Sequence, residues 1–356
     1  MGGPRIDRID KNYLINGDFL FAQRSGFGVI NTPNFKADRF RGSFSGFTNE
    51  VEQEIIAGDV PFGGGNSLKI ICDATNVVAN DFWGIHYAFE GQMVQALKGK
   101  KIGITWYTKT NHDDQYSFNL FTTRDGAEYD SFVTGFDVVQ ANGWERHDKI
   151  IDLTGHDPRD SNAVGMSFAI ELKASATRQT STPDIWNPEN GGVPLRGITG
   201  QGNFFDTIGN EIQFSKVMVY EVLDENGFIG DDVYMSAGRS YAEELALCQR
   251  YFQKWGLPDV NTTIGNGAFV TTTVGSITIV LRQEMRTNPI MSSPDPTGFR
   301  MNNASNNFQV TSINAYSSNT KMATVNFNSL TVAINGSAIS SLSNAGSSVL
   351  HADAEL

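Results

Sequence analysis

The chain has 356 residues, 40% of them apolar, so it is long enough for about two or three hydrophobic cores and too apolar for global disorder. Its formal net charge of -12 argues against non-specific binding to nucleic acid or to an anionic membrane. No run of about 18 apolar residues exists and the first residues lack a hydrophobic signal core. We therefore expect no membrane insertion and no Sec export.

Residues 1–11 are charged and unpatterned, so we expect a mobile arm or a joint to an upstream segment. An Asn16-Gly17-Asp18 turn then predicts one strand on either side of it. The further strands come at intervals typical of a jelly roll, over residues 37–44, 51–56, 67–72, 83–91, 100–109, 116–123, 144–153, 164–172 and 211–221. We predict a jelly-roll β-sandwich over residues 12–225.

Alternation gives each predicted strand an inward and an outward face. The inward residues predict the core: Trp83, Ile85, Tyr87, Phe89, Ile102, Ile104, Trp106, Met166, Phe168, Ile170 and Leu172. The outward faces mix aromatic and hydrogen-bonding groups, which favours a solvated ligand face. Its candidate ligand-binding residues are His86, Tyr107, Asn119, Phe121 and Glu171.

Between Lys173 and Gly209 the strand pattern lapses into a long loop, and loops of this length inside a compact domain are often functional. The loop carries Trp186 between Pro183 and Pro188. An exposed indole there favours stacking on a sugar ring, which makes Trp186 a sixth candidate ligand residue. Packing that closes the loop is an equal alternative.

Residues 240–255 predict the one clear helix, within a connector over residues 226–257. Ser240 and Glu243 form a capping box, and Leu245, Cys248 and later apolar residues recur at helical spacing. Gly256 ends the pattern. Beyond the connector, residues 258–356 alternate again and predict a smaller C-terminal β-sandwich, so the expected fold class is all-β with one connecting helix.

Histidines and cysteines suggest no transition-metal site and no disulfide. The five histidines are scattered, with no local pair at metal-ligand spacing. Cys72 and Cys248 fall in strand-like and helix-like patterns, so we expect two buried, apolar thiols.

Acidic residues offer little catalytic chemistry. A glycosidase needs two carboxylates across the sugar bond, and the adjacent pairs Asp113-Asp114 and Asp231-Asp232 do not supply that geometry. We interpret both pairs as solvated turn acids. No cofactor is required, although oxygen-rich turns also suit a structural calcium ion. Its candidate ligands are Asn16, Asp18 and Asp206.

Several stretches resemble a family of bacteriophage tail fibre proteins. The start of their carbohydrate-binding-type jelly roll is similar to RIDRIDKNYLINGDFLFAQRSG and ADRFR, and its closing part is similar to GITGQGNFFDTIGNEIQFSKVMVYE. The following helix and the C-terminal sandwich resemble SYAEELALCQRYFQKW, RQEMRTNPIM and ADAEL. The chain departs from many relatives in the longer, acidic connector VLDENGFIGDDVYMSAGR, where they carry Ala-Thr-Pro-Phe-Glu. It also has Phe21 or Ala22 where the family usually has Trp.

The resemblance implies a phage virion protein at the tip of a tail fibre, assembled in the bacterial host cytoplasm together with other virion tail proteins. It implies a homotrimer that recognises the host surface, by binding cell-surface glycan without catalysis, and it carries over no catalytic residue. A structural or decoration protein of the capsid or tail is the alternative. A polysaccharide-degrading enzyme is a third hypothesis, which would need a cleft with paired carboxylates.

Overall fold

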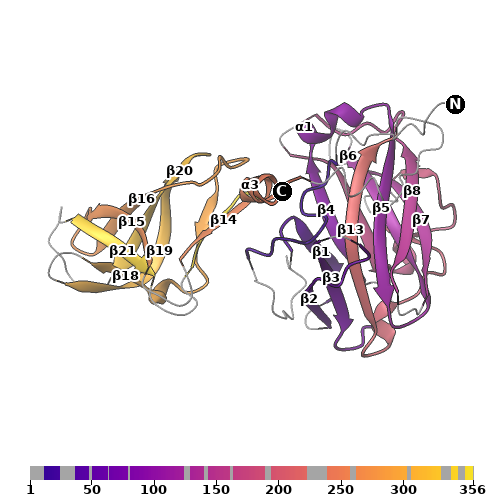
Figure 1. Ribbon diagram of the computed structural model, residues 1–356, viewed down its shortest axis with the longest axis horizontal. Coiled ribbons are helices and arrows are strands. Elements are labelled where there is room, and N and C mark those ends of the chain that lie inside the picture. The colour runs from indigo at the N-terminus through magenta and orange to yellow at the C-terminus, as the bar shows by residue number, and fades with distance from the viewer. Residues whose placement is uncertain are drawn as a thin grey trace. The chain divides into compact units, whose positions relative to one another are not determined.

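The computed structural model describes residues 12–24, 37–47, 50–62, 64–78, 81–123, 129–139, 143–160, 163–188, 194–222, 239–256, 262–302, 306–329, 338–343 and 349–355. The predicted arm of residues 1–11 and the pair Asp231-Asp232 lie outside the described residues, as do residues 226–238 of the connector. The chain divides into two compact units, Met1–Glu244 and Leu245–Glu355. Both units consist mainly of strands (Figure 1), which confirms the predicted all-β class.

The first unit is a sandwich of two antiparallel sheets. In spatial order the six-stranded sheet contains β1 (Phe40–Ser45), β4 (Phe82–Glu90), β9 (Val164–Lys173), β6 (Asp114–Thr123), β7 (Tyr129–Val138) and β11 (Trp186–Pro188). The five-stranded sheet contains β2 (Val51–Ala57), β3 (Asn66–Cys72), β13 (Glu211–Glu221), β5 (Lys101–Thr110) and β8 (Glu145–Asp152). Strands far apart in sequence are neighbours, as a jelly roll requires.

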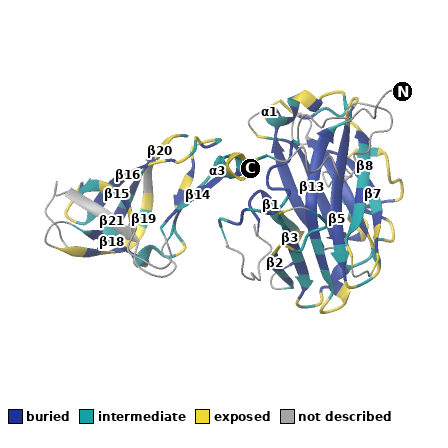
Figure 2. Cartoon of the chain, viewed as in Figure 1, coloured by how far each residue is buried: buried dark blue, intermediate teal, exposed yellow. Residues whose placement is uncertain are grey.

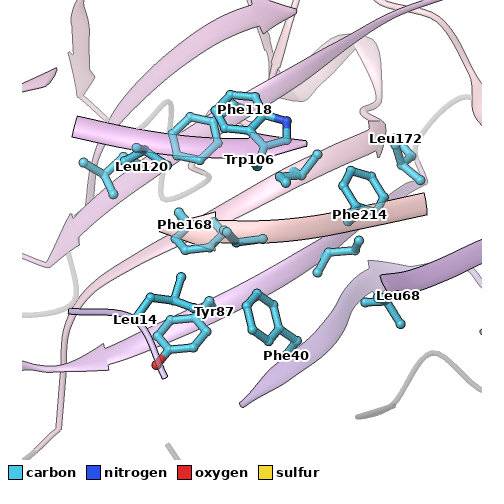
Figure 3. Packing of buried hydrophobic residues seen from close by; sticks show 14 of the residues in the cluster. Leu14, Phe40, Leu68, Tyr87, Trp106, Phe118, Leu120, Phe168, Leu172 and Phe214 are labelled. Atoms are coloured by element: carbon cyan, nitrogen blue, oxygen red, sulfur yellow. The ribbon is translucent and has the colours of Figure 1, made fainter. Parts of the chain in front are cut away.

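The two sheets enclose one hydrophobic core, and every inward residue predicted above is buried in it. Figure 3 shows Phe118 of the six-stranded sheet beside Trp106 of the five-stranded sheet, where their rings stack at 5.1 Å. Tyr87 and Phe168 stack at 5.7 Å on neighbouring strands. Burial of one such aromatic side chain contributes roughly 1.5–3 kcal/mol, so these layers dominate the stability of the unit.

Three local predictions differ from the structure. Residues 12–24 form turns and extended segments with no strand, because their polar groups bond to scattered partners, as when Tyr13 N donates to Val219 O at 2.8 Å. Strand β7 was not predicted, since Gly135 interrupts its alternating pattern. The predicted loop 173–209 contains short elements: η2 (Ala176–Arg178), β10 (Gln179–Thr180), β11, β12 (Gly197–Ile198) and η3 (Phe204–Asp206).

The predicted helix is shorter than its apolar pattern. Helix α3 covers Tyr241–Gln249, and the capping box is present because Ser240 N donates to Glu243 Oε2 at 2.8 Å. The predicted extension to Trp255 is wrong, since Phe252–Trp255 is strand β14, paired antiparallel with β22 (Leu350–Asp353). Pairing with a distant strand therefore overrides the local helical spacing.

In the second unit, six strands close into a barrel where the sequence predicts a small sandwich. In spatial order they are β15 (Thr262–Phe269), β16 (Val274–Val280), β20 (Met322–Ser329), β19 (Asn307–Ser318), β18 (Phe299–Asn302) and β21 (Ala338–Ser343). Closure leaves these strands without a free edge, and a separate sheet of β14, β22 and β17 (Ile290–Ser292) accompanies the barrel.

The remaining described helical turns are α1 (Gly91–Val94), η1 (Gln95–Leu97) and η4 (Pro296–Gly298). No helix in the described parts of the chain has the length and apolar character needed to span a membrane. Burial concentrates in the strands and exposure in the connections (Figure 2). Cys72 and Cys248 are both buried, as predicted, and burial raises the pKa of the Cys72 thiol to about 11.

Candidate functional site

Four of the six predicted ligand residues lie on one face, the outer face of the six-stranded sheet. Ala169 of β9 is opposite His86 on β4 and opposite Asn119 on β6, so these side chains share a face. Glu171 is two residues along β9 from Ala169, and Phe121 is two residues along β6 from Asn119. Their common spacing of two residues places all four outward.

Tyr107 lies elsewhere. It belongs to β5 in the five-stranded sheet, between Arg146 on β8 and Ser215 on β13. Its ring is 5% exposed and meets Phe62 edge-on at 5.3 Å. The structure therefore separates Tyr107 from the four ligand candidates on the six-stranded sheet by the thickness of the sandwich.

Trp186 also lies apart, in edge strand β11, and not in an open loop as the sequence suggested. The residue opposite it on β7 is Phe132, which belongs to the core, so the indole lies on the inner side of the sheet. Its ring stacks on His156 at 4.4 Å, and its Nε1 donates to Asp152 O at 2.8 Å. The half-buried indole therefore packs at the edge of the sandwich. Of the two alternatives for Trp186, sugar stacking and packing that closes the loop, this contact corresponds to the second.

The outer face of the six-stranded sheet is not solvated as predicted. Glu171 and Asn119 are fully buried, because residues 194–198 cross over them. Ile198 N donates to Ser117 Oγ at 2.9 Å, and Ile198 packs with Leu195 and Val133. Part of the predicted loop therefore covers this face.

Two arginines of the cover reach the face together. Strands β10 and β12 pair in parallel, and Arg196 N donates to Arg178 O at 2.7 Å. The guanidinium carbons of Arg178 and Arg196 lie 4.4 and 4.1 Å from the centre of the Phe82 ring. Two cations therefore share one aromatic ring on β4, which is a favourable cation–π arrangement for each of them.

Glu171 is the buried anion of this group and forms an ion pair with Arg196. Asn119 Nδ2 donates to Arg196 O at 2.8 Å and lies 3.4 Å from Glu171 Oε1. Burial raises the pKa of Glu171, and the charge of Arg196 opposes that shift. Gly84 leaves room for the carboxylate, since a Cβ at Gly84 would lie 2.5 Å from Glu171 Oε2.

His86 is surrounded by positive charge. Arg41 Nε lies 3.2 Å from His86 Nδ1. Burial and then the guanidiniums of Arg41, Arg196 and Arg39 hold the pKa of His86 well below its ordinary value. We call this set of residues the arginine face: Arg41, Phe82, His86, Asn119, Phe121, Glu171, Arg178 and Arg196.

Several buried polar atoms of the arginine face have no hydrogen-bond partner among the described residues. They are Glu171 Oε2, Asn119 Oδ1 and Arg196 Nε, and Ser131 Oγ on neighbouring strand β7 joins them. A buried polar atom without a partner costs roughly 1–3 kcal/mol, so native proteins usually supply one, often a water or a ligand. These atoms include both acceptors and a donor.

Sequence reasoning missed the arginines of this face. Arg178 and Arg196 are distant in sequence, in a segment without periodicity, and Arg41 is one charged residue in an amphipathic strand. The length of the segment was the one available signal, and it did indicate a functional loop.

The predicted calcium ligands have separate neighbours. Asn16 is buried, its Nδ2 donates to Phe21 O and Asp38 O at 2.9 Å, and its Oδ1 accepts from Phe21 N. Asp18 pairs with Lys216 at 3.0 Å, and Asp206 ends the helical turn η3. Among the described residues, no group of three or more His, Cys, Asp or Glu could hold a metal ion.

No family model and no curated protein matches this sequence. Solved structures with similarity include the enzymatically active domain of tailspike protein 4 from bacteriophage CBA120, at 12% identity and a TM-score of 0.34. That match covers 59% of this chain and 21% of the tailspike chain, so this chain spans about a fifth of its length.

Two further similar structures are carbohydrate-binding modules. The family 11 module from Clostridium thermocellum, in complex with a mixed-linked tetrasaccharide, has 10% identity and a TM-score of 0.29 over 56% of this chain and 97% of its own. The tandem CBM22-1–CBM22-2 domain of Xyn10C from Paenibacillus barcinonensis has 8% identity and a TM-score of 0.29 over 94% and 99%. At these scores the similarities carry no argument about the ligand of this chain.

Proposed function

We propose that this chain binds glycan on the arginine face, without catalysis, as a receptor-binding protein at the tip of a phage tail fibre. The observation that carries the proposal is the set of unpartnered buried atoms on that face, Glu171 Oε2, Asn119 Oδ1 and Arg196 Nε. A sugar hydroxyl both donates and accepts, so one hydroxyl that enters when residues 194–198 move aside can satisfy a carboxylate or amide oxygen and a guanidinium N–H together. The phage setting is supported by the sequence resemblance alone.

The chemistry around Glu171 favours binding over hydrolysis. Hydrolysis of a glycosidic bond uses two carboxylates on opposite sides of the sugar. The side chains that act on the pKa of Glu171 within the described residues are Arg196, Asn119 and Arg178, which are cationic or neutral. Such a set can hold and orient a hydroxyl, and it offers no acid and base pair.

Ser131→Ala tests the proposed face with little risk to folding, because Ser131 Oγ is buried and has no hydrogen-bond partner in the described part of the chain. We expect the variant to keep the stability of the parent chain and to bind glycan several-fold more weakly on an array of bacterial surface polysaccharides. Ser276→Ala, in strand β16 of the second unit, is the matched control and should bind like the parent chain.

Full binding by Ser131→Ala would remove this face from the proposal. If the parent chain binds no polysaccharide and does not adsorb to a panel of bacterial strains, the chain is better explained as a structural or decoration protein. In that case ordered water would satisfy the unpartnered atoms.

We also propose that the chain is a homotrimer in the virion, where several weak sites act together on one cell surface. Light scattering should then give three times the 39.0 kDa of one chain, and the trimer should survive mild SDS. A monomer, or five- or six-fold stoichiometry, would contradict the fibre assignment and favour the structural alternative.

A further inference from the structure

We propose that the glycan bound by the arginine face is acidic, and that its anionic group, a carboxylate or a phosphate, binds the guanidinium of Arg178 beside Arg196. This inference rests on the proposed function and narrows the class of ligand.

The first argument is charge. Two guanidiniums, those of Arg178 and Arg196, lie against the Phe82 ring, and the carboxylate of Glu171 is the one anion of the described residues that acts on both of them. The whole chain has a formal net charge of -12, so a local positive excess runs against its composition. A partly desolvated positive excess is costly, and a bound anion would offset that cost.

The second argument is the position of Arg178. Glu171 already pairs with Arg196, and the one carboxylate is therefore shared between two neighbouring guanidiniums. The pKa of Arg178 is lowered by burial and by the charge of Arg196. Its side chain is half-buried, in contrast to Glu171, so a ligand can reach it from solvent.

The third argument is geometry. The Phe82 ring holds both guanidiniums at 4.4 and 4.1 Å, and the backbone bond from Arg196 to Arg178 fixes their spacing. The N–H groups of a guanidinium lie in one plane, which suits bidentate binding of a carboxylate or phosphate.

The test compares charged and neutral forms of one glycan. The full chain is applied to an array of bacterial surface polysaccharides, with each acidic polymer beside the form from which its carboxylate or phosphate has been removed. We expect the acidic form to bind at least about tenfold more tightly than its neutral form. The kind of group whose removal weakens binding in this way identifies the anion.

Variants then assign the effect to one residue. Arg178→Gln should lose most of the preference for the acidic form while still binding the neutral one, and Arg178→Lys should lose part of it because the planar fork is lost. Arg159→Gln removes an equal charge from an exposed position in the same unit and should keep the preference. Thermal unfolding of each variant shows whether the fold is retained.

The outcomes separate this inference from the proposed function. Equal binding of acidic and neutral forms, or an equal loss in Arg159→Gln and Arg178→Gln, would overturn the acidic ligand and leave glycan binding intact. Binding to no polysaccharide at all would overturn both.

Discussion

His147 should make the first unit acid-sensitive. It lies on the inner face of β8, where its ring stacks on Trp106 at 5.4 Å and its Nε2 is 2.7 Å from Thr108 Oγ1. Burial lowers its pKa to about 4. The unfolded chain, with an ordinary pKa of about 6.5, then binds a proton at a higher pH than the folded chain. Protonation therefore favours unfolding, and stability is lost as the pH falls from about 6.5 to about 4.

The difference between the two pKa values corresponds to roughly 3 kcal/mol when the pH is below both, and to roughly 2 kcal/mol near pH 5. Denaturant unfolding followed by tryptophan fluorescence measures this loss, because Trp83, Trp106, Trp144 and Trp186 all belong to the first unit. His147→Gln keeps a hydrogen-bonding group and cannot titrate in this range. We expect it to be less stable than the parent chain at neutral pH.

The test compares the parent chain with His147→Gln. For each, it measures how much the free energy of unfolding changes between about pH 7.5 and pH 5. Other buried histidines, such as His86, contribute to both chains, so the parent should lose roughly 2 kcal/mol more than His147→Gln. His351→Gln, in the second unit, is the control and should lose as much as the parent. Equal losses in the parent and in His147→Gln would refute the reasoning.

Three further predictions concern residues singled out from the sequence. Trp186→Ala should cost about 2 kcal/mol of stability, through the lost His156 stack and Asp152 bond, and leave glycan binding unchanged. Loss of binding with full stability would make Trp186 a ligand residue. Asn16→Ala should cost roughly 3 kcal/mol in denaturant unfolding, because three buried side-chain bonds are lost, and a cost under about 1 kcal/mol would contradict this. EDTA should leave the thermal midpoint unchanged, because Lys216 already neutralises Asp18, and a drop that calcium reverses would establish a calcium site.

The sequence by itself determined the fold class, most of the long strands and the core of the first unit. Alternation identifies the inward side of each strand, because inward residues recur at every second position in any sheet. Trp83, Trp106 and Phe168 were predicted as core on this basis, and all three are buried in it. The start of helix α3 was equally local, since Ser240 and Glu243 satisfy each other within one turn.

Only the tertiary structure decided which outward residues act together. Alternation says that His86 and Tyr107 both point away from the core, and it cannot say that they belong to opposite sheets. Nor could local spacing foresee that Phe252–Trp255 would leave the helix to pair with Leu350–Asp353. The arginine face is the clearest case, because Arg178 and Arg196 join Glu171 through the parallel pairing of two very short strands. Contacts between segments far apart in sequence have no period, so only the folded chain specifies them.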